Sequence, residues 1–115
     1  MQKDILDFLP LNPATLHILL ALAGEEMHGY GIMQEVEART RKKVRLGPGT
    51  LYGSIKRMIA DNLIEESEER PDPALDDERR RYYRLTRFGR LVAVAEAERL
   101  ENLVGAARSK KLLRA

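Results

Sequence analysis

The sequence predicts a mainly α-helical protein with a small β-hairpin, built as one domain from 115 residues. Apolar residues recur every three or four positions in several segments, which is the spacing of one face of a helix. Late in the chain this spacing changes to alternation on either side of a polar, proline-containing stretch, which is typical of two strands and a loop. No cysteine is present to form a disulfide, so the fold depends on its apolar core.

The first two helices are predicted from their start signals and their apolar spacing. Asn12 offers a side-chain acceptor to a first turn, and Pro13 needs no amide partner there, so a helix begins at this point. A second helix is predicted over residues 30–40, with Ile32 and Val36 on its apolar side. The apolar positions of the first helix, and the glycine that ends it, are Leu16, Leu19, Leu20, Ala23 and Gly24.

A basic loop over residues 41–45 separates the second helix from a third. The third helix begins at residues 47–50, because this Gly-Pro-Gly-Thr stretch cannot continue a helix but can start one. Its buried side is predicted from five apolar residues, which are Leu51, Ile55, Met58, Ile59 and Leu63.

A hairpin and a long helix complete the chain. Residues 63–67 and 80–85 have the pattern of strands, and the stretch between them is polar and rich in turn residues. Thr86 then provides a cap for a last helix, which continues without proline to about residue 111.

The last helix carries two apolar stripes, although one is enough to cover its own domain. At about 100° per residue, Phe88, Leu91, Val92 and Ala95 fall on one side, and a second set falls roughly opposite. The second set has nothing left to bury against in so short a chain, so we expect a second copy to cover it. A loosely packed helix end is the alternative. The residues of this predicted dimer interface are Ala93, Ala97, Leu100, Val104 and Ala107.

Three helices, a hairpin and a final helix follow one another in the order of a winged helix-turn-helix domain with a C-terminal dimerisation helix. We expect residues 1–86, N-terminal segment included, to form the DNA-binding domain and residues 87–115 to form the dimerisation helix. In a helix-turn-helix the second helix of the motif enters the major groove, and neighbouring segments hold the phosphates.

Charge is segregated along the chain. The formal net charge is only +2, yet residues 38–60 and 79–90 contain bases and no acids, whereas residues 61–78 contain nine acids and one base. A polyanion responds to such blocks rather than to the total. The alternative is that each run is a solvated face paired with neighbouring acids. The position of the blocks in the predicted fold favours DNA binding.

The exposed side of the third helix suits a DNA groove. Its small residues allow close approach of the backbone, its hydroxyls and bases can bond to phosphates or base edges, and no acid occurs before Asp61. Thr50 has the alternative role of a helix cap, and Tyr52 that of a half-buried core residue. The predicted DNA-binding residues of this helix are Thr50, Tyr52, Gly53, Lys56 and Arg57.

Two more basic segments flank the third helix. The returning arm of the hairpin would lie beside the DNA backbone or in the minor groove, and the loop over residues 41–45 attracts a polyanion without reading its sequence. Asp76, Asp77 and Glu78 precede the hairpin arginines, and they either pair with these arginines or exclude wrong registers. The bases predicted to contact DNA in these segments are Arg79, Arg80, Arg81, Lys42 and Lys43.

Four segments of the sequence match a known family in order and spacing over about residues 10–92. They read HGYGIMQEV from His28, LGPGTLYGSIKRM from Leu46, NLIEE from Asn62 and RRYYRLTRFGR from Arg80. These segments resemble the PadR family of bacterial transcriptional regulators, in its smaller branch with a single C-terminal helix. The resemblance implies a homodimer that binds an inverted-repeat operator in double-stranded DNA and usually represses transcription, with the C-terminal helix exchanging contacts between subunits.

The resemblance also raises the question of a small-molecule effector. Some small relatives hold flat aromatic ligands between aromatic side chains at the dimer centre, but residues 89–115 contain no Phe, Tyr or Trp. A pocket formed by Phe8, the segment 5–9 and the dimer helices is another site for an effector. The alternative is that this segment simply packs on the dimer helix. Where relatives commonly have glycine, this chain has Asn62 and the run of bases from Arg41.

Other function classes find little support in the sequence. Two histidines without cysteine make no standard metal signature, and neither histidine has a nucleophile at a fixed spacing, so we expect no enzyme, no metal and no cofactor. No apolar run approaches the roughly 20 residues of a membrane span, so we expect a soluble, cytoplasmic protein that does not contact a membrane. The main rival is a winged-helix module for protein–protein contacts, with its basic faces meeting an acidic partner.

Overall fold

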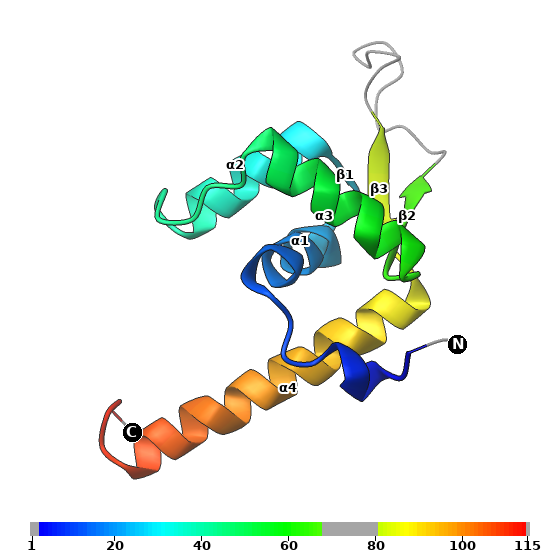
Figure 1. The fold of residues 1–115 in the computed structure, drawn as a ribbon. Helices are drawn as coiled ribbons and strands as arrows, with labels where there is room; N and C mark the ends of the chain where they lie inside the picture. Colours follow the sequence, from blue (N-terminus) through cyan, green and yellow to red (C-terminus); the bar gives the residue numbers. More distant parts are fainter. Residues whose placement is uncertain (1–2, 68–80, 115) are drawn as a thin grey trace.

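The computed structural model describes residues 3–67 and 81–114 of the chain. It is mainly helical with a small antiparallel sheet, so the predicted fold class is confirmed (Figure 1). The elements in chain order are the short 3-10 helix η1 (Ile5–Phe8), α1 (Pro13–Gly24), β1 (Met27–His28), α2 (Gly29–Arg39), α3 (Pro48–Ala60), β2 (Ile64–Ser67), β3 (Tyr82–Leu85) and α4 (Arg87–Ser109).

The helices begin where the local start signals predict. The side chain of Asn12 accepts a hydrogen bond from the amide of Thr15 at 2.9 Å, which caps α1. The hydroxyl of Thr86 accepts from the amide of Gly89 at 2.8 Å and caps α4. The cap of α2 is the Nδ1 atom of His28, a role that a histidine fills only with an unprotonated nitrogen.

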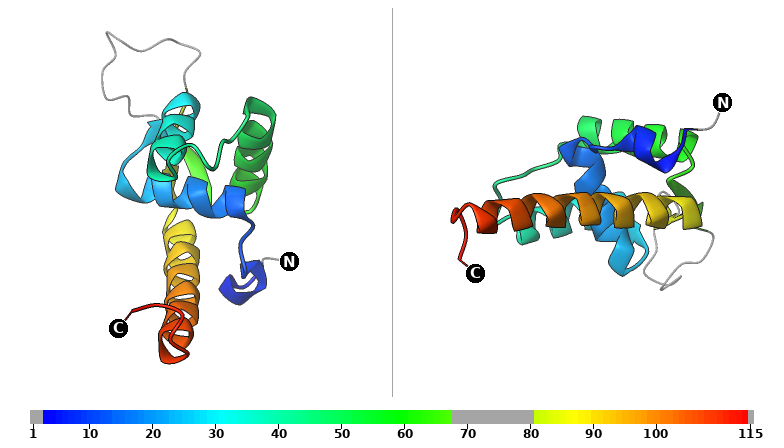
Figure 2. Two further views of the ribbon diagram at one scale, coloured as in Figure 1. Left: turned by 90° about the vertical axis from the view of Figure 1, so that its left-hand side faces the viewer. Right: turned by 90° about the horizontal axis from the view of Figure 1, so that it is seen from below.

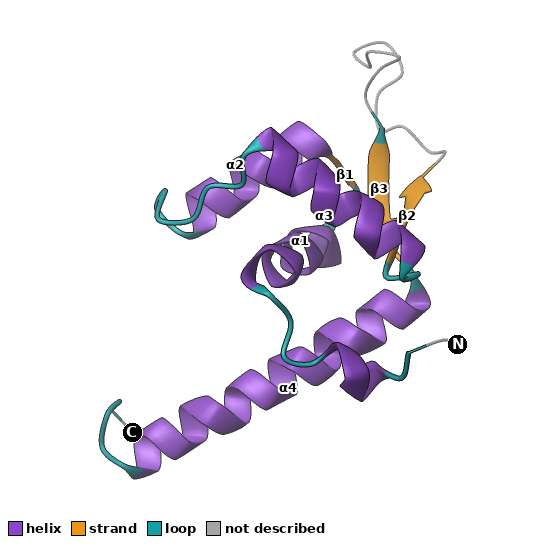
Figure 3. Ribbon diagram, in the orientation of Figure 1, coloured by secondary structure: helices purple, strands orange, loops and turns teal. Residues whose placement is uncertain are grey.

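The sheet contains one strand more than the predicted hairpin. β3 is central, and it pairs antiparallel with β2 on one side and with β1 on the other (Figure 3). Met27 lies opposite Tyr83 in the pair of β1 and β3. A strand of two residues is too short to produce an alternating pattern, which explains why the sequence did not reveal β1.

The core is built around α1, which contacts α2, α3, α4 and β3. Ile18, Leu19, Ala21 and Leu22 of α1 are almost completely buried. The apolar stripe predicted for this helix was therefore only partly right, because Leu20 is 43% exposed. Elements pack on several sides of α1, so its burial does not follow a single stripe.

The buried side of α3 follows the prediction with one exception. Leu51, Ile55 and Met58 are buried, as is Leu63 just after the helix. Ile59 was predicted to be buried but is 42% exposed. It lies to one side of the stripe, where no other element covers it completely.

The first half of α4 packs on the body of the protein, and the second half extends away from it (Figure 2). Val92 and Glu96 are completely buried. Leu91, predicted to lie on the covered side, is 48% exposed, whereas Ala93 of the predicted dimer face packs against the chain's own core. The division of the chain at residue 86 stays a prediction.

The N-terminal segment lies against α4 and is fastened to it. The rings of Phe8 and Phe88 meet edge to face with their centroids 5.8 Å apart. The amide of Leu11 donates a hydrogen bond of 2.9 Å to the carboxylate of Glu96, which also accepts from the guanidinium of Arg99. These contacts satisfy a carboxylate that has no exposure to solvent. Within the two described stretches, no helix has the length and apolar character needed to cross a membrane.

Candidate nucleic-acid interface

The exposed side of α3 carries the predicted groove-contacting residues. Leu51, Ser54, Ile55 and Met58 hold the opposite side of the helix in the core. No acidic residue occurs anywhere between Pro48 and Ala60. The exposed residues of α3 include Gly49, Thr50, Tyr52, Gly53, Lys56, Arg57 and Ala60.

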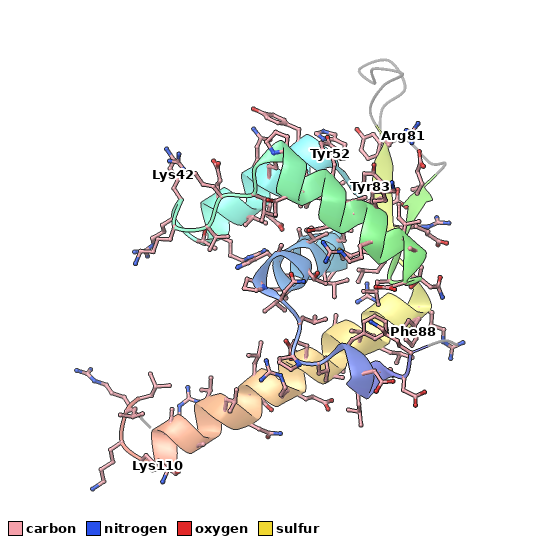
Figure 4. The ribbon with its side chains drawn as sticks, in the orientation of Figure 1. Lys42, Tyr52, Arg81, Tyr83, Phe88 and Lys110 are labelled. Carbon is pink, nitrogen blue, oxygen red and sulfur yellow. The ribbon has the colours of Figure 1, made fainter. Side chains whose placement is uncertain are left out.

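Tyr52 is half-buried, as the alternative role of a core residue requires, and its contact with DNA stays a prediction. Its side chain is 49% exposed, so half of the ring is accessible. The other part lies on the backbone at the start of α2, where a β-carbon built on Gly29 would be 2.5 Å from the Tyr52 hydroxyl oxygen. Tyr52 therefore packs its hydroxyl end on the start of α2, while about half of the residue stays exposed on α3 (Figure 4).

The basic loop between α2 and α3 is held by a threonine. The hydroxyl of Thr40 donates to the carbonyl of Val36 at 2.8 Å and accepts from the amide of Val44 at 3.1 Å. Arg41 and Lys42 adopt left-handed backbone angles, with φ of 52° and 65°. Lys42 and Lys43 are both exposed. This loop thus presents several bases from a defined turn.

The hairpin that contains β2 and β3 is the wing of the winged helix. Its arginines differ in how closely neighbouring acids pair with them. Arg84 pairs with Glu65 at 3.0 Å and with Glu26 at 3.7 Å. Arg81 has a looser contact of 3.6 Å with Glu66, and 69% of its side chain is exposed. The sequence did not reveal these pairs, because they depend on how the strands pair. Glu65 of β2 lies opposite Arg84, Glu66 lies opposite Tyr83, and Glu26 precedes β1.

Part of the predicted wing contact lies outside the described residues. Arg79 and Arg80 belong to this part, as do the acids Asp76, Asp77 and Glu78. Arg81 is the predicted wing contact that belongs to the described residues.

The wing and α3 meet at Tyr83. Burial raises the pKa of the Tyr83 hydroxyl, and the nearby Glu66 carboxylate raises it further. The nearby Tyr52 also raises the pKa of the Tyr83 hydroxyl, whereas the positive charge of Arg81 lowers it. In Figure 4, Lys42, Tyr52 and Arg81 lie along the upper side of the molecule, whereas Lys110 lies at the lower end of α4.

Exposed apolar side chains occur on both halves of α4, with Leu91 and Val94 on the first half and Leu103 and Val104 on the second. Of the predicted dimer residues, Ala97 and Val104 are exposed, and Leu100 and Ala107 are partly buried. Leu103, which the prediction missed, is 56% exposed. It is spaced from Val92 and Glu96 by eleven and seven residues, and so continues the stripe that faces the body. The prediction missed Leu103 because Glu96 interrupts this stripe in the sequence, and a carboxylate is rarely assigned to an apolar stripe.

Comparisons with known proteins agree with this arrangement. The sequence profile described as "Transcriptional regulator PadR-like family" matches residues 18–95. A Mycobacterium tuberculosis protein named transcriptional regulator Rv3488 is 40% identical over 88 residues, which cover 76% of each chain.

Solved structures resemble the fold as well. A PadR family transcription regulator from Clostridium difficile superposes with a TM-score of 0.68 at 24% identity, covering 85% of this chain and 97% of its own. A transcriptional regulator from Clostridium thermocellum has the same TM-score of 0.68 at 22% identity, covering 84% of this chain and 87% of its own.

Proposed function

The chain belongs to the PadR-like family of transcriptional regulators, and from this membership we propose that it binds double-stranded DNA as a homodimer. The proposed site is an inverted-repeat operator, and the proposed action is repression in the cytoplasm, where the regulated DNA lies. Members of this family are regulators and not enzymes, as the sequence predicted.

The observation that carries the proposal is the acid-free, exposed side of α3. Its small residues, Gly49 and Gly53, leave room for the helix backbone to approach DNA. Thr50 offers a hydroxyl to phosphates or base edges, Tyr52 offers the exposed part of its side chain, and Lys56 and Arg57 add positive charge. A helix that merely faced solvent would more often carry acid–base pairs at a spacing of four residues.

The second half of α4 supports the dimer. A helix of 23 residues is about 35 Å long at about 1.5 Å per residue, so it extends well past a body that buries only its first turns. Leu103 and Val104 are 56% and 37% exposed on this half. Two copies packed through these residues would hide the apolar surface and would present two α3 helices to successive turns of one DNA face.

Selection of genomic DNA fragments by the protein, followed by fluorescence anisotropy on the retained site, tests the proposal. An inverted repeat should be enriched, and affinity for any duplex should fall steeply with salt because phosphate contacts release counterions. Lys56→Ala and Arg81→Ala should each weaken binding by about 1–3 kcal/mol.

Lys110→Ala is the matched control, because Lys110 is also exposed but lies at the far end of α4. It should bind as the wild type does. Equal binding by the wild type and by both interface variants at moderate salt would contradict the proposal and would favour a protein partner for the basic faces.

Release of the operator by a small-molecule effector completes the proposal. Its support is that Arg57, on the exposed side of α3, also lines a cavity with the N-terminal segment. A ligand there would act directly on a residue proposed to contact DNA.

A further inference from the structure

A cavity of about 280 Å³ lies between the N-terminal segment, the start of α1 and the end of α3. Its apolar lining includes Phe8 from the N-terminal segment, Met58 from α3 and Leu63 after it. Met58 and Leu63 are each 2% exposed, so the floor is part of the core. This volume is at the lower limit of ligand pockets, which span about 300–1,000 Å³, and it admits only a small molecule.

Both signs of charge line the same cavity. Arg57 and Asp61 stand one helical turn apart at the end of α3, and Lys3 and Asp7 come from the N-terminal segment opposite. None of these four side chains forms an ion pair with another residue in the described stretches. The ammonium of Lys3 lies 5.2 Å from the centroid of the Phe8 ring. Two cations and two carboxylates therefore surround an apolar floor.

We propose that this cavity binds a small zwitterion, an α-amino acid with an apolar side chain. The carboxylate of such a ligand pairs with Arg57 or Lys3, its ammonium group pairs with Asp61 or Asp7, and its side chain lies on Phe8 and Met58. A simple organic acid leaves both carboxylates facing its own negative charge, and a simple amine leaves both cations facing its positive charge. Only a zwitterion pairs with both the cations and the carboxylates of the cavity.

The regulatory consequence rests on the proposed function. Arg57 is one of the exposed bases of α3 that we assign to DNA, and a guanidinium paired with a bound carboxylate is no longer available to a phosphate. The bound amino acid therefore lowers the affinity for duplex.

Isothermal titration calorimetry on the full chain without DNA tests the site. The probes are L-phenylalanine, phenethylamine and 3-phenylpropanoate, which share one apolar body and differ in charge. L-phenylalanine should bind at least tenfold more tightly than either of the others. The proposal is overturned if all three probes bind with similar affinity. It is also overturned if L-phenylalanine gives no binding signal at about 10 mM, which lies above a millimolar Kd. Either result would leave the cavity to a segment of a partner copy.

Two variants test the charges. Asp61→Asn and Arg57→Gln should each weaken binding of L-phenylalanine at least tenfold, with unchanged circular dichroism. Their matched controls are Glu101→Gln and Arg90→Gln on α4, both at exposed positions away from the cavity, which should leave the Kd within twofold. Equal behaviour of cavity variants and controls overturns the assignment.

Anisotropy of a labelled operator duplex, with and without L-phenylalanine, tests the regulation. Saturating ligand should weaken duplex binding at least fivefold in the wild type. Loss of duplex binding already without ligand would count against the proposed function and leave the calorimetric result intact. Unchanged duplex binding by a protein that calorimetry shows to be saturated overturns the regulatory step alone.

Discussion

Gly89 in the first turn of α4 packs directly on the main chain of Leu63. A β-carbon built on Gly89 would lie 1.8 Å from the carbonyl oxygen of Leu63, far inside contact distance. The same oxygen accepts hydrogen bonds of 3.1 Å from the amide and from the hydroxyl of Thr86. The segment that follows α3 and the first turn of α4 can therefore lie this close together only because Gly89 has no side chain.

Replacement of Gly89 by alanine should lower the free energy of unfolding by about 3 kcal/mol, because backbone rather than a mobile side chain has to move. Urea unfolding at one fixed protein concentration measures the change. Gly105→Ala on the same helix is the control, since nothing lies within 4 Å of a β-carbon built there. It should stabilise the protein by about 0.5–1 kcal/mol through helix propensity. Similar effects of the two substitutions would show that the junction is looser than described.

Glu96 should give the protein a measurable sensitivity to acid. The hydrogen bond from Arg99 is the main cause that holds the pKa of Glu96 below its ordinary value of 4.5, and the amide of Leu11 adds to it against the effect of burial. The folded protein therefore binds this proton less readily than the unfolded chain does. The resulting stability is present above the ordinary value and is lost as the pH falls through the lower, native pKa.

Glu96→Gln should remove this pH-dependent part, so the acid side of a stability–pH curve from urea unfolding should become flatter. At neutral pH the substitution should cost about 1–3 kcal/mol, because a charged hydrogen bond is lost in a buried place. Glu101→Gln, an exposed change on the same helix, should alter stability by less than about 0.5 kcal/mol and keep the wild-type curve. If the acid side of the stability–pH curve were the same in Glu96→Gln as in the wild type, Glu96 would not be the source of the acid sensitivity.

Replacement of Lys42 by glycine should relieve backbone strain and remove one positive charge from the loop. The Lys42 φ of 65° is costly for a residue with a β-carbon, so Lys42→Gly should raise the free energy of unfolding by about 0.5–1 kcal/mol. Lys43 is outside the left-handed region, and Lys43→Gly should be neutral or destabilising. Each substitution removes one base from the loop, so each should reduce the salt slope of duplex binding by about 1. Opposite effects on stability with equal effects on DNA binding are the expected signature.

Leu103 should be required for the dimer. Leu103→Glu places a charge in the exposed apolar stripe of α4, and it should give monomers in sedimentation velocity while circular dichroism stays unchanged. Operator affinity should fall about 100-fold or more, because the two half-sites are no longer bound by one linked molecule. Asn102→Glu adds the same charge at the neighbouring exposed position and should remain dimeric. A dimeric Leu103→Glu would place the subunit contact elsewhere.

Local signals in the sequence predicted most of the secondary structure correctly. Asn12 and Thr86 cap their helices through side-chain oxygens that bond an amide three residues further on, so no distant contact is involved. The exposed side of α3 was equally predictable, because helical spacing separates Leu51 and Ile55 from Lys56 and Arg57.

The features that the sequence did not reveal depend on contacts between distant segments. The buried carboxylate of Glu96 is satisfied in part by the amide of Leu11, which lies 85 positions away in the chain. Arg84 is held by Glu26 and Glu65, whose proximity depends on the pairing of β2 and β3 and on the unpredicted β1. Periodicity describes one element at a time, and therefore it does not contain this information.

The hydrogen bond from Leu11 to Glu96 adds a polar link to the apolar packing between the N-terminal segment and α4. Leu11 also lines the cavity beside α3, so one short piece of main chain touches the cavity and is anchored on α4. Because this hydrogen bond is direct, a shift of the segment at Leu11 would either move α4 with it or break the bond. In the dimer that we propose, α4 joins the two chains, so such a shift would change the distance between the two α3 helices. A ligand bound in the cavity of one chain would then affect how both chains meet DNA.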